Sequence, residues 1–189
     1  MVCWRITNYA DRRTVDKYFL VCAAVVAIAG AIGDAQSRKI PNRLTLSALA
    51  VGLLTRAAIE GWYGFGSAIT AALVGGGVFY LFFLAGGLGG GDVKLMSAVG
   101  AWAGVSQVIP VLVAAAIAGG LLAAYYLVAD GGLGRTLRNT VELMRHHCVS
   151  GVSSHPEINV RQTSLTRVPF GLAIAMGTLF CAGSALLRR

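Results

Sequence analysis

Charged residues are scarce in this chain. They make up 13% of its 189 residues, whereas hydrophobic residues make up 56% and the mean hydropathy is +0.70. This composition excludes an ordinary soluble globular domain and is typical of a protein that crosses a membrane several times. The net charge of +8 does not indicate nucleic-acid binding, because the basic residues lie in short polar gaps between apolar runs and are not interleaved with aromatic residues. Anionic lipid headgroups are the expected partner of these charges.

Paired cysteines and catalytic nucleophile motifs are missing as well. The four cysteines are scattered and form no CxxC pair, which argues against a zinc site or a disulfide framework. His146, His147, Cys148 and His155 lie in a polar stretch with irregular spacing, and nothing near them resembles a nucleophile elbow. We therefore predict no metal and no cofactor.

Six apolar runs occupy most of the chain. They are 18–33, 44–60, 65–85, 93–109, 110–128 and 168–187. Each is near the ~17–25 residues that a bilayer-spanning helix needs, and all should be helical because lipid cannot satisfy an open backbone. Pro110 and the polar pair Ser106-Gln107 predict a turn between the fourth and fifth runs. The expected fold is all-α, with about six transmembrane helices in a single domain over 1–189, a polar N-terminal segment at 1–17 and a polar loop at 129–167.

The positions of lysine and arginine predict how the chain lies in the membrane. Most basic residues of the internal loops fall on one side and only Arg56 falls on the other, so the basic side should be cytoplasmic. The basic residues at the two termini would then face outward, against the rule. Arg56 and Glu60, four residues apart, are expected to pair at a helix end. A cleaved signal peptide is the alternative for the first run, and the acidic residues before it argue against this.

The same alternation puts two acids on one membrane face: Asp34 at the end of the first run and Asp92 at the start of the fourth. Two carboxyls at matching depth suit an aspartyl hydrolase, in which one takes a proton from water and the other donates a hydrogen bond to the scissile carbonyl. Asp is also a common helix cap, so position alone leaves a structural role open. Helix dipoles would favour the charge on Asp92, at a helix N-terminus, and the shared proton on Asp34, at a helix C-terminus.

Three short stretches resemble the signature regions of one family. They are "GDAQSRKIPNRLT" at 33–45, "GGGDVKL" at 89–95 and "RVPFGLAIAMG" at 167–177. In this order and spacing they are similar to the type 4 prepilin peptidases, and the chain length resembles their short, CpaA/TadV-like branch of tight-adherence pilus systems. The resemblance implies a GxGD-type membrane aspartyl endopeptidase in the bacterial cytoplasmic membrane. It also implies prepilin or pseudopilin substrates and a link to pilus-assembly machinery.

The resemblance assigns roles to individual residues of this chain. Asp34 and Asp92 match the catalytic pair, and Gly89 and Gly91 match the glycines of GxGD, which let a backbone approach the acid closely. The residues that match supporting positions are Lys94, Pro41, Asn42, Pro169, Phe170 and Gly171. Lys94 should point away from Asp92 and contact a headgroup or the substrate leader. The prolines fit a turn and the first turn of the last helix.

Larger members of this family carry a segment with paired CxxC elements that is associated with N-methylation of the processed pilin. This sequence has no such pair, so N-methyltransferase activity is not expected. Two alternatives to a prepilin peptidase stay open. One is a preflagellin peptidase or another GxGD intramembrane protease. The other is a small transporter or pilus-assembly scaffold whose two buried acids bind protons or ions.

Overall fold

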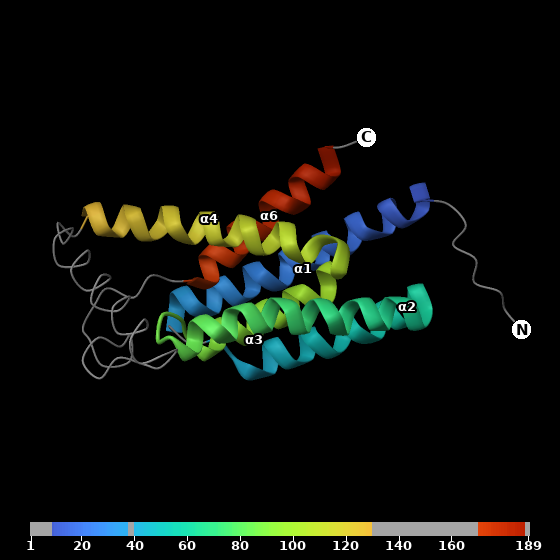
Figure 1. The fold of residues 1–189 in the computed structure, drawn as a ribbon, viewed down its shortest axis with the longest axis horizontal. Coiled ribbons are helices and arrows are strands. Elements are labelled where there is room, and N and C mark those ends of the chain that lie inside the picture. Colours follow the sequence, from blue (N-terminus) through green and yellow to red (C-terminus); the bar gives the residue numbers. More distant parts are fainter. Residues whose placement is uncertain (1–8, 38–39, 130–169, 188–189) are drawn as a thin grey trace, which may run out of the picture.

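The computed structural model describes residues 9–37, 40–129 and 170–187, and within these ranges every regular element is an α-helix. The helices are α1 (Tyr9–Ser37), α2 (Asn42–Leu84), α3 (Gly90–Ala103), α4 (Val105–Ala129) and α6 (Phe170–Leu187). They lie roughly along one axis and form an elongated bundle (Figure 1). The all-α fold expected from the sequence is confirmed. The predicted loop at 129–167 lies, apart from its first residue, outside the described residues, and so do Pro169 and the histidines.

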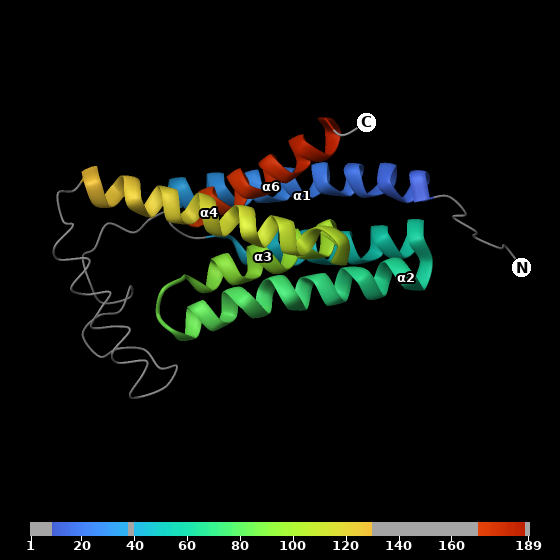
Figure 2. The ribbon, with the colours of Figure 1, turned by 45° about the horizontal axis from the view of Figure 1, so that its top comes forward.

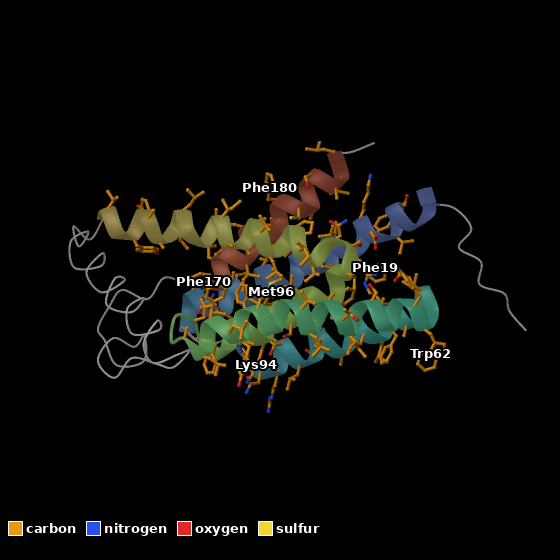
Figure 3. All side chains as sticks on the ribbon, in the orientation of Figure 1. Phe19, Trp62, Lys94, Met96, Phe170 and Phe180 are labelled. Carbon is orange, nitrogen blue, oxygen red and sulfur yellow. The ribbon has the colours of Figure 1, made fainter. Side chains whose placement is uncertain are left out.

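Helix α2 consists of two antiparallel arms. Gly61 interrupts it with a positive φ of 67° and a ψ of −151°, a conformation that favours glycine because it has no Cβ. The arms lie side by side in both views of the ribbon (Figures 1 and 2). They correspond to the apolar runs 44–60 and 65–85, so the described residues contain the six helical segments that the sequence predicted. Trp62, beside the turn, is 87% exposed at one tip of the bundle (Figure 3).

The predicted turn between the fourth and fifth runs was wrong by several residues. The break falls at Gly104, whose φ is 73°, and Pro110 lies inside α4. Glycine adopts this left-handed conformation without strain, whereas proline in a membrane helix can be tolerated when neighbouring groups compensate for its missing N–H. The position of the turn is therefore set by Gly104, the residue that can adopt a positive φ, and not by the polar residues and proline that follow it.

Small residues allow the helices to pack closely. The most extensive contacts join α2 to α3, and α6 to both α1 and α4, while α1 also packs on α3 and connects the two groups. A Cβ at Gly75 would lie 3.1 Å from the carbonyl oxygen of Met96, and one at Gly100 would lie 2.5 Å from that of Ala71. The glycines at 75 and 100 therefore serve helix packing, as small residues do in other membrane bundles.

Four of the helices are long and apolar enough to cross a membrane: 14–37, 42–84, 105–126 and 170–187. Helix α3 has 14 residues and is about 21 Å long, shorter than the ~30 Å hydrocarbon layer. Large apolar side chains are exposed on the outside of the bundle, among them Leu73, Ile117 and Phe180, as expected where lipid is the solvent. The chain is an integral membrane protein.

A buried arginine holds one end of the bundle together. Arg56, on the first arm of α2, is 2% exposed and pairs with Glu60 at 2.8 Å and with Asp16 of α1 at 3.4 Å. Its guanidinium also donates to the carbonyl oxygens of Trp102 and Ala103 at 3.0–3.1 Å, which are left without intrahelical partners at the end of α3. The predicted pairing with Glu60 is confirmed. We call this end of the bundle the arginine end.

Candidate active site

Asp34 and Asp92 lie at the opposite end of the bundle, which we call the aspartate end. Asp34 belongs to the last turn of α1, and Asp92 belongs to the first turn of α3. Because α1 and α3 run in opposite directions and pack on each other (Figure 1), these two turns meet. The carboxyls are close enough for their charges to interact. Asp92 is 8% exposed, and Asp34 is half-buried.

Asp92 is fixed by the glycine-rich turn that precedes it. The N–H of Gly89 donates to Oδ2 of Asp92 at 3.1 Å, and the N–H of Asp92 donates to the carbonyl of Gly89 at 3.1 Å. An acid in the first turn that accepts the N-cap N–H is half of a capping box. A Cβ at Gly89 would lie 3.2 Å from that same Oδ2. The first glycine of the GxGD motif therefore leaves room for the carboxyl of its own aspartate.

Asp34 is fixed by a different helix, far away in sequence. The N–H of Gly171, in the first turn of α6, donates to Oδ2 of Asp34 at 3.2 Å. A Cβ at Gly171 would lie 3.1 Å from this oxygen and 3.1 Å from the Cβ of Asp34. The sequence assigned Gly171 to the opening of the last helix, but it contained no signal for this contact. The glycine of the PFG element is thus part of the carboxyl site.

This contact removes the reason to distinguish the two acids by helix dipoles. Asp34 does end α1, but it also lies at the N-terminus of α6, where N–H groups and the positive end of the dipole favour a carboxylate. Asp92 has the equivalent position on α3. Since both carboxyls accept a hydrogen bond at a helix N-terminus, helix dipoles give no reason to expect the proton on Asp34 rather than on Asp92, contrary to the expectation from the sequence.

Each carboxyl keeps one oxygen available for chemistry. Within residues 9–37, 40–129 and 170–187, Oδ1 of Asp34 and Oδ1 of Asp92 accept no hydrogen bond, while each Oδ2 is held by one N–H. A pair with one proton and two available oxygens can bind a water and polarise a carbonyl group.

The IPN element lies against the first turns of α3. Pro41 is the N-cap of α2, and its carbonyl accepts from the N–H groups of Leu44 and Thr45. Lys94 donates through Nζ to Oδ1 of Asn42 at 2.9 Å. A Cβ at Gly91 would lie 3.2 Å from the Cβ of Ile40. The structure therefore joins residues of two motifs that the sequence treated separately.

Phe170 anchors the start of α6. Its ring packs edge-on against Phe79 of α2, with 6.4 Å between the ring centroids, and a Cβ at Gly119 of α4 would lie 3.0 Å from the same ring. Figure 3 shows Phe170 at the beginning of α6, at the end of the bundle opposite Phe19 and Trp62. This packing holds the N–H of Gly171 where it meets Asp34.

Among the described residues, neither a candidate metal cluster nor a large cavity near the arginine end coincides with the acids. The described part of the chain contains no group of three or more His, Cys, Asp or Glu residues that could hold a metal ion. A cavity of about 1150 Å³ lies between α1, α4 and α6, and its lining includes Asp16, Lys17 and Phe180 but neither Asp34 nor Asp92. The carboxyl pair, with its defined hydrogen bonds, is the stronger candidate for chemistry.

The fold and the site define a class: a membrane-embedded helical bundle with two neighbouring carboxyls at one end. The sequence model of the type IV leader peptidase family matches residues 20–124. This is more than half of the chain, and the chain belongs to that family. The matched range contains Asp34, Asp92, both GxGD glycines and Lys94, but not the start of α6. No solved structure matches the chain.

Three curated relatives carry the name prepilin leader peptidase/N-methyltransferase. The proteins of two Burkholderia pseudomallei strains, 1026b and K96243, are each 37% identical over 112 residues, or 53% of this chain and 34% of the relative. The protein of Xanthomonas campestris pv. campestris is 30% identical over 118 residues, or 57% of this chain and 39% of the relative. The matches thus span little more than a third of the length of these relatives.

Proposed function

We propose that this protein is a membrane aspartyl endopeptidase that removes the leader peptide from prepilin-like substrates, with Asp34 and Asp92 as its catalytic pair. One observation carries the proposal: two acids from distant parts of the chain meet at one end of the bundle, each with one oxygen held by an N–H. Membership of the type IV leader peptidase family supports the reaction class.

The geometry supports a general acid–base mechanism. With one proton shared between the carboxyls, the ionised one takes a proton from a bound water, whose oxygen attacks the scissile carbonyl carbon. The protonated carboxyl donates a hydrogen bond to the carbonyl oxygen and stabilises the charge that develops there. When the tetrahedral intermediate collapses, the C–N bond breaks, and the carboxyl that took the proton from water gives it to the leaving amine. The N–H groups of Gly89 and Gly171 hold Oδ2 of each acid in place, so that Oδ1 of each faces the reacting groups.

We also propose a membrane face for the site, a class of substrate and a branch of the family. We propose that the site lies at the cytoplasmic face of the bacterial inner membrane, because Arg43 and Lys94 lie in the first turns of α2 and α3, at the aspartate end, and basic residues favour that side. The substrates are prepilins or pseudopilins, and the branch is the short, tight-adherence type. These 189 residues carry no CxxC pair, so we expect cleavage without N-methylation of the product.

Co-expression with candidate prepilins from the same genome, followed by mass measurement of their N-termini, tests the proposal. Asp34→Asn and Asp92→Asn should each abolish cleavage, because an amide keeps the shape of the carboxyl but cannot exchange its proton. Asp16→Asn is the matched control: it removes a carboxyl from α1 at the arginine end and should leave cleavage in place. Full processing by either site variant would exclude the aspartyl mechanism. A methyl mass increment that depends on this chain alone would overturn the claim about methylation.

A further inference from the structure

Two contacts hold the segment Ile40–Asn42 against the beginning of α3. The ammonium of Lys94 donates to Oδ1 of Asn42 at 2.9 Å across 52 positions of sequence. The side chain of Ile40 covers Gly91, where an added Cβ would lie 3.2 Å from the Cβ of Ile40. Gly91 directly precedes Asp92 and Lys94 follows it by two residues. The contacts therefore lie on both sides of Asp92 in the sequence of α3.

The position of the Lys94 charge is unusual. Asn42 is the first residue of α2, and a cation near a helix N-terminus meets the positive end of the helix dipole, which is unfavourable. No ion pair of Lys94 with an acid occurs among the described residues. A neutral amide oxygen is its hydrogen-bond partner. Helix stability alone therefore gives no reason for a lysine at this position. A role in holding the start of α2 against α3 does give one.

The hydrogen bond also contributes little to the stability of the bundle. Lys94 and Asn42 are both exposed, and exposed charged contacts are worth little because solvent competes for them. Substitutions at these two residues should leave the helices folded. Their effect can therefore be measured on the site itself.

We propose that Lys94 and Asn42 are positioning residues for the carboxyl site. Their hydrogen bond fixes the start of α2, and with it Ile40, on the first turns of α3, so that the turn carrying Asp92 keeps its distance from the end of α1. The inference rests on the proposed peptidase function for its kinetic consequence, and its structural consequence can be measured without any substrate.

The kinetic test is a double-mutant cycle with purified protein and a prepilin substrate. Lys94→Met removes the ammonium and keeps most of the aliphatic stem, and Asn42→Leu removes the acceptor. Each should lower kcat roughly 2- to 5-fold, the factor that corresponds to the upper range for an exposed charged contact, with KM unchanged. The double variant should be no worse than the poorer single variant, because both remove the same bond. Asn42→Asp keeps an acceptor oxygen and should retain activity.

Arg43→Met is the matched control. It removes one exposed positive charge next to Asn42 and should leave kcat unchanged if the bond, rather than local charge, matters. If Lys94 instead contacts the substrate leader or a lipid headgroup, Lys94→Met will raise KM and Asn42→Leu will have no effect. That pattern, or single effects that multiply in the double variant, overturns the proposal.

Hydrogen exchange gives a second readout that does not need activity. The N–H groups of Leu44 and Thr45 bond to the carbonyl of Pro41 at 3.1 and 3.3 Å, so they report on the first turn of α2. Lys94→Met and Asn42→Leu should each speed exchange of a peptide covering 40–46, whereas Lys94→Arg, which keeps a donor, should not. If exchange is unchanged in both variants, the positioning role is excluded. If it rises while the wild-type protein cleaves no prepilin, the positioning role holds and the proposed function fails.

Discussion

Replacing Arg56 by methionine tests how much the arginine end contributes to the stability of the bundle. The guanidinium makes five hydrogen bonds, to Glu60, Asp16 and the carbonyls at the end of α3, and its carbon Cζ lies 4.2 Å from the ring centroid of Phe19. Four of these bonds join different helices, where hydrogen bonds average about 0.6 kcal/mol each, and the pairing with Glu60 within α2 adds a few tenths of a kcal/mol, which gives about 3 kcal/mol. Breaking a buried ion pair from one side costs ~3–5 kcal/mol. Because Asp16 is 25% exposed, water can solvate its carboxylate when Arg56 is replaced, so we expect a cost at the lower end of this range, about 3 kcal/mol.

The assay is unfolding of the purified protein in mixed micelles, followed by circular dichroism as denaturing detergent is added. Arg56→Met should lower the free energy of unfolding by about 3 kcal/mol. Adding Glu60→Gln to it should restore part of the loss, because a carboxylate that is 10% exposed is then no longer left without its partner. Arg43→Met, the exposed control on the same helix, should stay within ~0.5 kcal/mol of the wild type. A similarly small effect of Arg56→Met would refute the reasoning.

Two further predictions concern glycines. Gly171→Ala should lower cleavage about 10-fold while the protein stays folded. The new Cβ would lie 3.1 Å from Oδ2 of Asp34, and small displacements of reacting groups slow a reaction considerably. A normal kcat in this variant would show that the contact is not needed. Gly177→Val should destabilise the protein by ~1–3 kcal/mol, because any Cβ there meets the backbone of Ala115 where α6 crosses α4. Gly120→Val is the control for this variant, since a Cβ at Gly120 meets nothing within 4 Å. Equal stability of the two variants would contradict the packing argument.

Several features of the protein could be predicted from the sequence because they depend on local composition. The six helical segments follow from the six apolar runs. Their directions alternate because each successive run carries the chain back toward the opposite end of the bundle. That alternation was enough to predict that Asp34 and Asp92 lie at the same end of the bundle. The pairing of Arg56 with Glu60 followed from their spacing on one helix. The signal for each helix lies within a stretch of about 20 residues.

Other features could not be predicted because they depend on which helices are neighbours and how each is rotated about its axis. The hydrogen bond from Gly171 to Asp34 spans 137 positions, and the bond from Lys94 to Asn42 spans 52. The break at Gly104 was missed because a proline six residues later is the stronger local turn signal. Hydropathy is the same for every rotation of a helix in lipid, so it predicts where helices run but not which side chains meet. Only the tertiary structure decided that a glycine of the last helix holds one acid and that a lysine beside the other acid holds the start of α2.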